Sequence, residues 1–183
     1  MSGGAHVDPS NKKIALLISI LALILAISET LGNGAQTKAL AANIEASNLW
    51  NFFQAKTVRM TVLRATAEAM ETESAGKPSP QAAAQIEKWR KTAERYDNEP
   101  DTNEGRKQLM ARAKSLESSR DLAMSAYHQY EIASAAVQIA IVLASSAVIT
   151  GLSVLSFAAF GLGVVGVAFT LIGLFAPTAV HLF

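Results

Sequence analysis

The sequence contains no cysteine, which excludes disulfide bonds, zinc sites built on thiolates and cysteine nucleophiles. Charge is also scarce, since only 17% of the residues are Asp, Glu, Lys or Arg while half are hydrophobic. Such a composition favours the membrane class. The formal net charge of +1 gives no reason to expect a nucleic acid or an acidic partner. With 183 residues, the chain is long enough for one ordinary domain.

Charge is missing altogether from the last part of the chain, where residues 132–183 include no Asp, Glu, Lys or Arg. As one helix these residues would be roughly 78 Å long, too long for one crossing of a hydrocarbon core of about 30 Å and suited to two. Gly151 marks the reversal and Pro177 ends the last apolar run. We therefore predict transmembrane helices over residues 132–150 and 157–176, followed by a C-terminal tail over residues 177–183.

Another apolar segment, residues 14–28, lies near the start of the chain behind Lys12 and Lys13. It covers roughly 22 Å as a helix, so it must recruit the residues up to Leu31 to cross the bilayer. We predict an N-terminal tail over residues 1–13 and a transmembrane helix over residues 14–31. The alternative is a signal peptide that is cleaved near Gly34. The two lysines favour an N-terminus in the cytoplasm.

The residues between these apolar segments, 35–131, carry nearly all of the charge and are predicted to form an extramembrane helical hairpin. Residues 35–75 place apolar side chains at alternating spacings of three and four, which is the seam pattern of a coiled coil. This first seam comprises Ala39, Ala42, Ala46, Leu49, Phe53, Lys56, Met60, Leu63, Ala67 and Met70. Lys56 is its polar member, and such a residue specifies register more often than it binds a ligand.

Two breaks divide the rest of the hairpin. Residues 76–80 end the first helix, with Ser79 and Pro80 well suited to start the short helix that follows to about Tyr96. Residues 97–100 form the second break. Asp101 and Glu104 then resemble a capping box at the start of the last soluble helix, whose seam includes the polar Arg120 and continues into the second span. The expected fold class is an all-α membrane protein, with three transmembrane helices and an antiparallel, coiled-coil-like helical hairpin between the first and the second.

Small residues recur at helical spacing in the last two spans. Lipid offers no hydrophobic drive for helix pairing, so a close approach of backbones through small side chains holds spans together. We predict this packing role for Ala140, Ala144, Gly163, Gly166 and Gly173. Either the stripes form a tightly packed hairpin within one chain, or one stripe mediates contact between copies of the protein.

The stretch NIEASNLWNFFQAK at residues 43–56 resembles the hallmark of an uncharacterised bacterial membrane family, catalogued as a domain of unknown function (family 4337). That hallmark is an Ala-Ser-Asn or Ala-Ser-Asp, a Trp, an aromatic pair and then Gln-Ala-Lys. Residues 137–143 and 161–166 are also similar to the family. Many members carry arginines between the last two spans, where residues 149–155 of this chain have no charge. The resemblance implies three spans and a helical middle, and it implies no activity.

Within this hallmark, Trp50, Phe53, Gln54 and Lys56 are the candidate interaction surface. Trp50, Phe53 and Gln54 lie close to one face of the predicted helix. One interpretation is that the aromatic side chains anchor the hairpin against the returning helix. The other is that they form a docking surface for another subunit, because large rigid side chains contribute strongly to binding.

No residues assemble into an enzyme site, and we expect no catalytic residues, cofactor or metal. The sequence lacks a phosphate-binding loop and a G-x-S-x-G motif. His6, His128 and His181 are far apart and show no metal-ligand spacing. Glu29 and Glu131 fall at the ends of spans, where interfacial placement is the simplest interpretation.

The expected function is that of a structural or interaction protein of the bacterial inner membrane. The lipid bilayer is its first partner, and its helical hairpin would join it to further copies of itself or to a larger membrane protein complex. It would be a multi-pass protein with its N-terminus in the cytoplasm. The alternative is a component of an oligomeric channel or transporter, because oligomers of short helices can enclose a pore.

Overall fold

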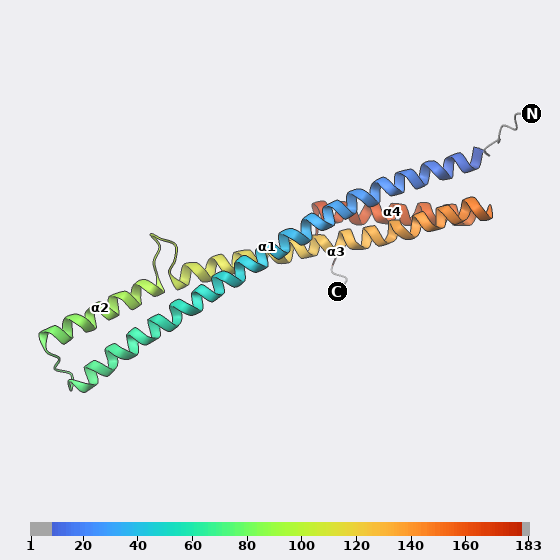
Figure 1. Ribbon diagram of the computed structural model, residues 1–183. Helices are drawn as coiled ribbons and strands as arrows, with labels where there is room; N and C mark the ends of the chain where they lie inside the picture. Colours follow the sequence, from blue (N-terminus) through green and yellow to red (C-terminus); the bar gives the residue numbers. More distant parts are fainter. Residues whose placement is uncertain (1–8, 181–183) are drawn as a thin grey trace, which may run out of the picture. The chain divides into compact units, whose positions relative to one another are not determined.

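The computed structural model describes residues 9–180, which form four α-helices and contain no strand. In chain order these are α1 (Pro9–Glu73), α2 (Pro80–Asp97), α3 (Arg106–Thr150) and α4 (Ser153–Phe175) (Figure 1). The expected all-α class is therefore confirmed. Among the described residues, α1, α3 and α4 are each long and apolar enough to cross a membrane.

The chain divides into two compact units. The first, called here the apolar bundle, combines the start of α1 up to Ala39 with the chain from Asp121 onward. The second, called here the helical arm, is Leu40–Arg120. The hairpin expected over residues 35–131 therefore contributes its central part to the arm and both of its ends to the bundle.

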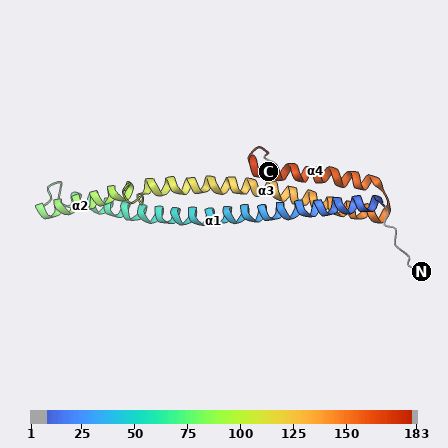
Figure 2. The same ribbon diagram turned by 90° about the horizontal axis from the view of Figure 1, so that it is seen from above.

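In the helical arm, α1 runs beside α2 and the beginning of α3, as Figure 2 shows. Partners pair in opposite order along the chain: Asn43 bonds Arg120, Trp50 bonds Glu117, and Glu71 bonds Arg90. The helices of the arm are therefore antiparallel. The predicted first seam faces inward, since Ala42, Ala46, Leu49, Lys56, Met60 and Ala67 are buried and Phe53, Leu63 and Met70 are half-buried.

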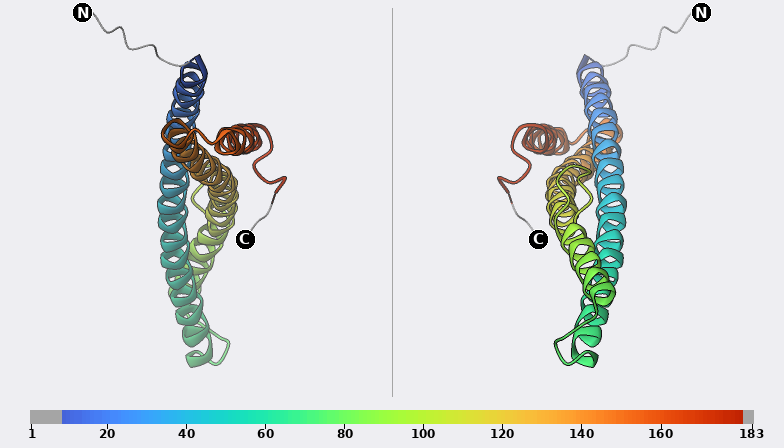
Figure 3. Two further views of the ribbon diagram at one scale, coloured as in Figure 1. Left: turned by 90° about the vertical axis from the view of Figure 1, so that its right-hand side faces the viewer. Right: turned by 90° about the vertical axis from the view of Figure 1, so that its left-hand side faces the viewer.

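The turn between α1 and α2 is visible in Figure 3 and follows from its residues. Ala75 and Gly76 adopt φ angles of 49° and 72°, a left-handed conformation that ends a helix. Ser79 then caps α2 by accepting a hydrogen bond from the Ala82 backbone N–H at 3.3 Å, with Pro80 in the first position of the helix. This is the start that the sequence predicts.

The start of α3 differs from the prediction. The helix begins at Arg106 rather than after Asp101, so the expected capping box does not form. Gly105 precedes it with its carbonyl bonded to the Leu109 N–H at 2.9 Å. The carboxylate of Glu104 lies 3.7 Å from Nζ of Lys56 instead. Glu104 therefore pairs with a charged residue on another helix and does not cap α3.

The apolar bundle consists of three helical segments in contact. Leu21 of α1 meets Val137, Ala140 and Ala144 of α3 and Ala159 of α4 in one buried core. α4 runs antiparallel to α3, because Gly166 lies against Val137 and Gly173 lies against Tyr130 (Figure 2). Beyond α4, the carbonyl of Val180 accepts a hydrogen bond of 2.8 Å from the buried Gln129 side chain of α3.

Helix α1 continues without a break through residues 32–34, which separate the expected first span from the expected hairpin. Gly32 is buried, and a Cβ atom there would lie 3.4 Å from Cβ of Tyr130. That separation is an ordinary van der Waals contact, so an alanine would also fit at this position. The glycine does not end the helix, although glycine in a helix costs about 1 kcal/mol relative to alanine.

Candidate functional site

The four residues predicted as an interaction surface lie on the arm segment of α1, but they are not equally accessible. Gln54 is exposed, Trp50 and Phe53 are half-buried, and Lys56 is only 4% exposed. Most of this group therefore contacts other parts of the arm, and Gln54 is the member that is free to meet a partner.

Trp50 links α1 to α3 by a hydrogen bond and by ring packing. Its indole Nε1 donates a hydrogen bond of 2.8 Å to Oε1 of Glu117, and its ring meets the Phe53 ring edge-on, with centroids 5.4 Å apart. Both rings pack on the core formed by Leu49, Leu109 and Ala113. A hydrogen bond to a carboxylate is stronger than one between neutral groups. These contacts fit the interpretation of the aromatic residues as an anchor within the hairpin.

Lys56 brings the connection between α2 and α3 onto α1. Its ammonium nitrogen lies 3.4 Å from Glu99 and 3.7 Å from Glu104, and it stands 5.2 Å from the ring centre of Phe52 and 5.7 Å from that of Tyr96. A buried charge is stable only when it is paired and hydrogen-bonded. Because its partners come from one short connection, Lys56 fixes the position of that connection along α1.

Arg106 makes a second cross-link beside Lys56. Its guanidinium donates to Oγ1 of Thr57 at 2.8 Å and to Oδ1 of Asp97 at 2.9 Å, and its centre lies 4.8 Å above the ring of Phe53. Sequence reasoning missed Arg106, because its partners are up to 49 residues away and no local pattern connects them. Together Trp50, Lys56 and Arg106 form a continuous set of contacts that we call the arm clasp.

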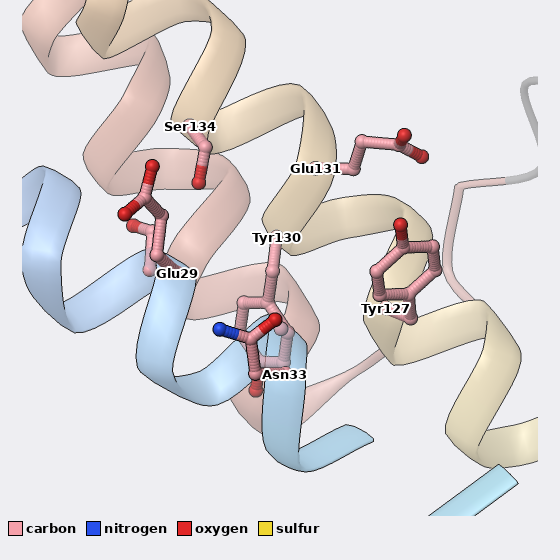
Figure 4. A pocket seen from close by; sticks show the side chains of 8 residues that line it. Glu29, Asn33, Tyr127, Tyr130, Glu131 and Ser134 are labelled. Atoms are coloured by element: carbon pink, nitrogen blue, oxygen red, sulfur yellow. The ribbon is translucent and has the colours of Figure 1, made fainter. Parts of the chain in front are cut away.

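A hollow of about 230 Å³ lies in the apolar bundle between α1 and α3 (Figure 4). Glu29 and Glu131 line it from opposite helices, with Ser134 and Tyr130 between them. Figure 4 shows Glu29 extending toward Ser134 and Glu131 extending away from it. Both carboxylates are exposed.

Each of these two carboxylates has a polar partner of its own. Glu29 accepts a hydrogen bond of 3.3 Å from Gln138, and Glu131 lies 3.6 Å from Nδ1 of His128. The two carboxylates therefore do not converge on one point. The carboxyl groups of an acid–base pair would face a common substrate. The arrangement here fits polar residues at the ends of apolar helical segments better.

The residues predicted to pack the spans lie inside the bundle. Ala140 and Ala144 are fully buried in its core. A Cβ atom at Gly163 would stand 2.6 Å from the Leu21 side chain, and one at Gly173 would stand 2.7 Å from the Tyr130 ring. A Cβ at Gly166 would collide with Val137. Both small-residue faces are thus covered by helices of the same chain.

Two hydroxyl groups join α1 to α4 within the bundle. Oγ of Ser28, which is buried, lies 2.8 Å from Oγ1 of Thr170, and Thr170 also donates to the carbonyl of Gly166 at 2.8 Å. In a lipid environment an interhelical hydrogen bond of this kind contributes about 0.6 kcal/mol.

No group of three or more His, Asp or Glu side chains within residues 9–180 is arranged to hold a metal ion. His128 is exposed on α3, just before the predicted second span over residues 132–150. His6 and His181 lie outside the described residues.

A family model described as a domain of unknown function (DUF4337) matches residues 10–176. The match covers most of the chain, including the hallmark around Trp50 and all three apolar segments. No curated protein and no solved structure matches the chain. The chain therefore belongs to the DUF4337 family, as the sequence resemblance suggests.

Proposed function

We propose that this member of the DUF4337 family is a structural or interaction protein of the bacterial inner membrane and is not an enzyme. Three apolar helices anchor it in the bilayer, and its helical arm joins it to further copies of itself or to another membrane protein. The observation that carries this proposal is the combination of an apolar three-helix bundle with an arm whose interior is occupied by its own side chains.

The surface of the bundle supports its placement in lipid. Large apolar side chains on all three of its helices point outward, including Leu16 on α1, Val142 on α3 and Phe160 on α4, which are 60–63% exposed. Exposed apolar patches of this extent mark contact with a membrane or a partner. A spanning helix needs about 20 residues, whereas α1 has 65 and α3 has 45, so much of both helices lies outside the bilayer.

The contacts within the arm support an interaction role, because its charged and aromatic groups are used to hold the arm together and do not surround a site for a ligand. The buried ammonium group of Lys56 and the indole N–H of Trp50 are engaged by partners in the arm. The clasp therefore holds the helices of the arm together, and the surface that remains for a partner is the outer face of these helices. A long helical surface on which the described reactive groups do not converge is typical of a scaffold.

A channel would need a polar path through the membrane, and the spans offer little of one. Ser145 and Ser146 donate to carbonyls one turn earlier in α3, and Ser28 is bonded to Thr170. These hydroxyl groups are used within or between helices of one chain. We therefore favour the interaction role over a pore.

Orientation follows from the lysines at the start of α1. With Lys12 and Lys13 on the cytoplasmic side, the arm lies outside the cytoplasm. Reporter fusions at Lys77, in the turn between α1 and α2, test this. A reporter active only in the cytoplasm should stay silent there, and activity would overturn the orientation.

The interaction role is tested with a photo-crosslinking amino acid at Gln54, which is exposed on the arm, and at Ala84 and Ala111, which are exposed on α2 and α3. Irradiation of intact membranes should produce defined protein adducts from at least one arm position. Ile139, which is 54% exposed on the bundle, serves as the comparison facing lipid. A chain that washes off the membrane, or that yields no adduct from any arm position, would contradict the proposal.

A further inference from the structure

Helix α1 has a second apolar face in the arm, opposite its buried seam. Between residues 40 and 69 nine exposed positions follow one another at spacings of three and four: Leu40, Ile44, Ser47, Asn51, Ala55, Val58, Val62, Ala65 and Ala69. With 3.6 residues per turn they lie roughly half a turn from the buried Leu49 and Met60. We call these nine residues the outer stripe.

The outer stripe is exposed and uncharged. Its four largest side chains, Leu40, Ile44, Val58 and Val62, are 53–62% exposed. Residues 40–69 include five charged side chains, and none of them belongs to the stripe: they are Glu45, Lys56, Arg59, Arg64 and Glu68. A solvated helix normally presents charge on the face opposite its core. The absence of charge along about 45 Å of exposed helix indicates that something covers this face.

The residue types indicate a parallel helix pair. In the heptad notation of coiled coils, Ile44 and Val62 occupy a positions, and Leu40 and Val58 occupy d positions, with one four-residue insertion between Asn51 and Ala55. A β-branched residue at a combined with Leu at d, as in Ile44 and Leu40, favours a two-stranded coiled coil, and a single Asn at a specifies register and oligomer state. Asn51 is such an a residue, and in a parallel pair it faces the same residue of the partner helix.

We propose that the outer stripe is the surface on which a second copy of this chain docks, with the two α1 helices parallel and in register. The inference rests on the proposed membrane anchoring, because two copies inserted with one orientation send α1 out of the bilayer in the same direction. A parallel pair then places Leu40 on Leu40, Asn51 on Asn51 and Val58 on Val58. An uncharged stripe introduces no like-charge repulsion between identical residues.

The contact area is sufficient for two copies in one membrane. A strip about 45 Å long and 10 Å wide on each helix gives roughly 900 Å² for the pair, close to the roughly 1,000 Å² that a specific interface needs. Anchoring in the same bilayer supplies the rest, because it raises the effective concentration of one stripe for the other. A soluble partner would have no such advantage on so narrow a face.

The absence of cysteine makes a direct test possible, because one introduced cysteine is the only thiol in the chain. In the full-length protein in native membranes, Val58→Cys should form a homodimeric disulfide under mild oxidation, because facing positions in a parallel pair fall within the 4.4–6.8 Å Cα separation that a disulfide requires. The control is Ala111→Cys, which is exposed on α3 away from the stripe and should stay monomeric.

A second pair of variants separates docking from folding. Val58→Lys with Val62→Lys places like charges against each other in the pair and should reduce the disulfide dimer of Ile44→Cys about tenfold. Ala84→Lys with Ala111→Lys adds the same charge at exposed positions on α2 and α3 and should leave it unchanged. Retained helical circular dichroism in both double variants would show that folding is intact.

The outcomes separate this inference from the proposed function. A homodimeric disulfide at Val58→Cys and not at Ala111→Cys supports the parallel pair. Absence of the stripe disulfide, equal disulfides at both sites, or a stripe disulfide that survives the lysine pair would overturn it. If the stripe disulfide is absent while other arm positions still crosslink to protein, the interaction role stands and the stripe assignment fails.

Discussion

Replacing Lys56 by Met tests the arm clasp, since Met keeps an apolar stem of similar length and removes only the charge. The substitution leaves Glu99, whose side chain is 18% exposed, without its closest cation on α1. Loss of one partner from a fully buried pair costs about 3–5 kcal/mol. Two features reduce that figure here: Glu104 is 53% exposed, and Arg95 remains 3.6 Å from Glu99. We expect a loss of about 2 kcal/mol in the free energy of unfolding of the arm.

Tryptophan fluorescence measures this loss in the full chain, because both tryptophans, Trp50 and Trp89, lie in the helical arm. Urea unfolding in mild detergent should give a lower midpoint for Lys56→Met with an unchanged slope. Glu104→Gln is the matched control, and its half-exposed carboxylate should cost less than 1 kcal/mol. Adding Glu99→Gln to Lys56→Met should cost less than the sum of the two single changes. A loss of unfolding free energy below about 0.5 kcal/mol for Lys56→Met would refute the clasp.

Two further changes test the anchor and the bundle. Trp50→Phe keeps the aromatic packing but removes the hydrogen bond to Glu117, so the free energy of unfolding of the arm should fall by about 1.5–3 kcal/mol. Urea unfolding followed by far-UV circular dichroism measures this loss, and an unchanged midpoint would show that the hydrogen bond contributes nothing. Gly173→Ala places a methyl group 2.7 Å from the Tyr130 ring and should lower the SDS concentration that disrupts the bundle. Gly161→Ala is the control and should not, because its added carbon meets nothing within 4 Å. Equal resistance of the two variants to SDS would contradict the tight α3–α4 contact.

The helices and their inward faces could be predicted because both depend on local patterns. Hydrophobic spacing alone identifies the first seam, whose members Ala42, Ala46 and Leu49 are buried in the structure. Turn residues identify the breaks in the same way: Gly76 takes a positive φ and Ser79 caps the next helix. Such features need no knowledge of which residues meet across the fold.

The departures from prediction arise where a distant contact overrides a local signal. Asp101 and Glu104 have the spacing of a capping box, yet Glu104 pairs with Lys56 on another helix and α3 begins later. Residues 32–34 lie between the predicted first span and the predicted hairpin, yet α1 continues through them, with Gly32 buried against Tyr130. In both cases the partner is far away in the sequence, so no window of neighbouring residues contains the information.

The candidate site shows the same division. The hallmark residues Trp50 and Lys56 stand out in the sequence by their types and spacing, whereas Arg106 and Glu99 do not, although they complete the clasp. The outer stripe could also be recognised only with the structure. Its positions form a pattern along α1, but their significance depends on knowing that the seam is buried on one face and that these residues are exposed on the other.

Membrane insertion is the central claim, and accessibility of single cysteines to a water-soluble maleimide in permeabilised cells tests it most directly. Val142 is 63% exposed in the structure and Gln54 is also exposed, so a protein in water would react at both Val142→Cys and Gln54→Cys. We predict that Gln54→Cys reacts readily and that Val142→Cys reacts only after the membrane is dissolved, because lipid covers it. Labelling of Val142→Cys as fast as Gln54→Cys in intact membranes would contradict the account.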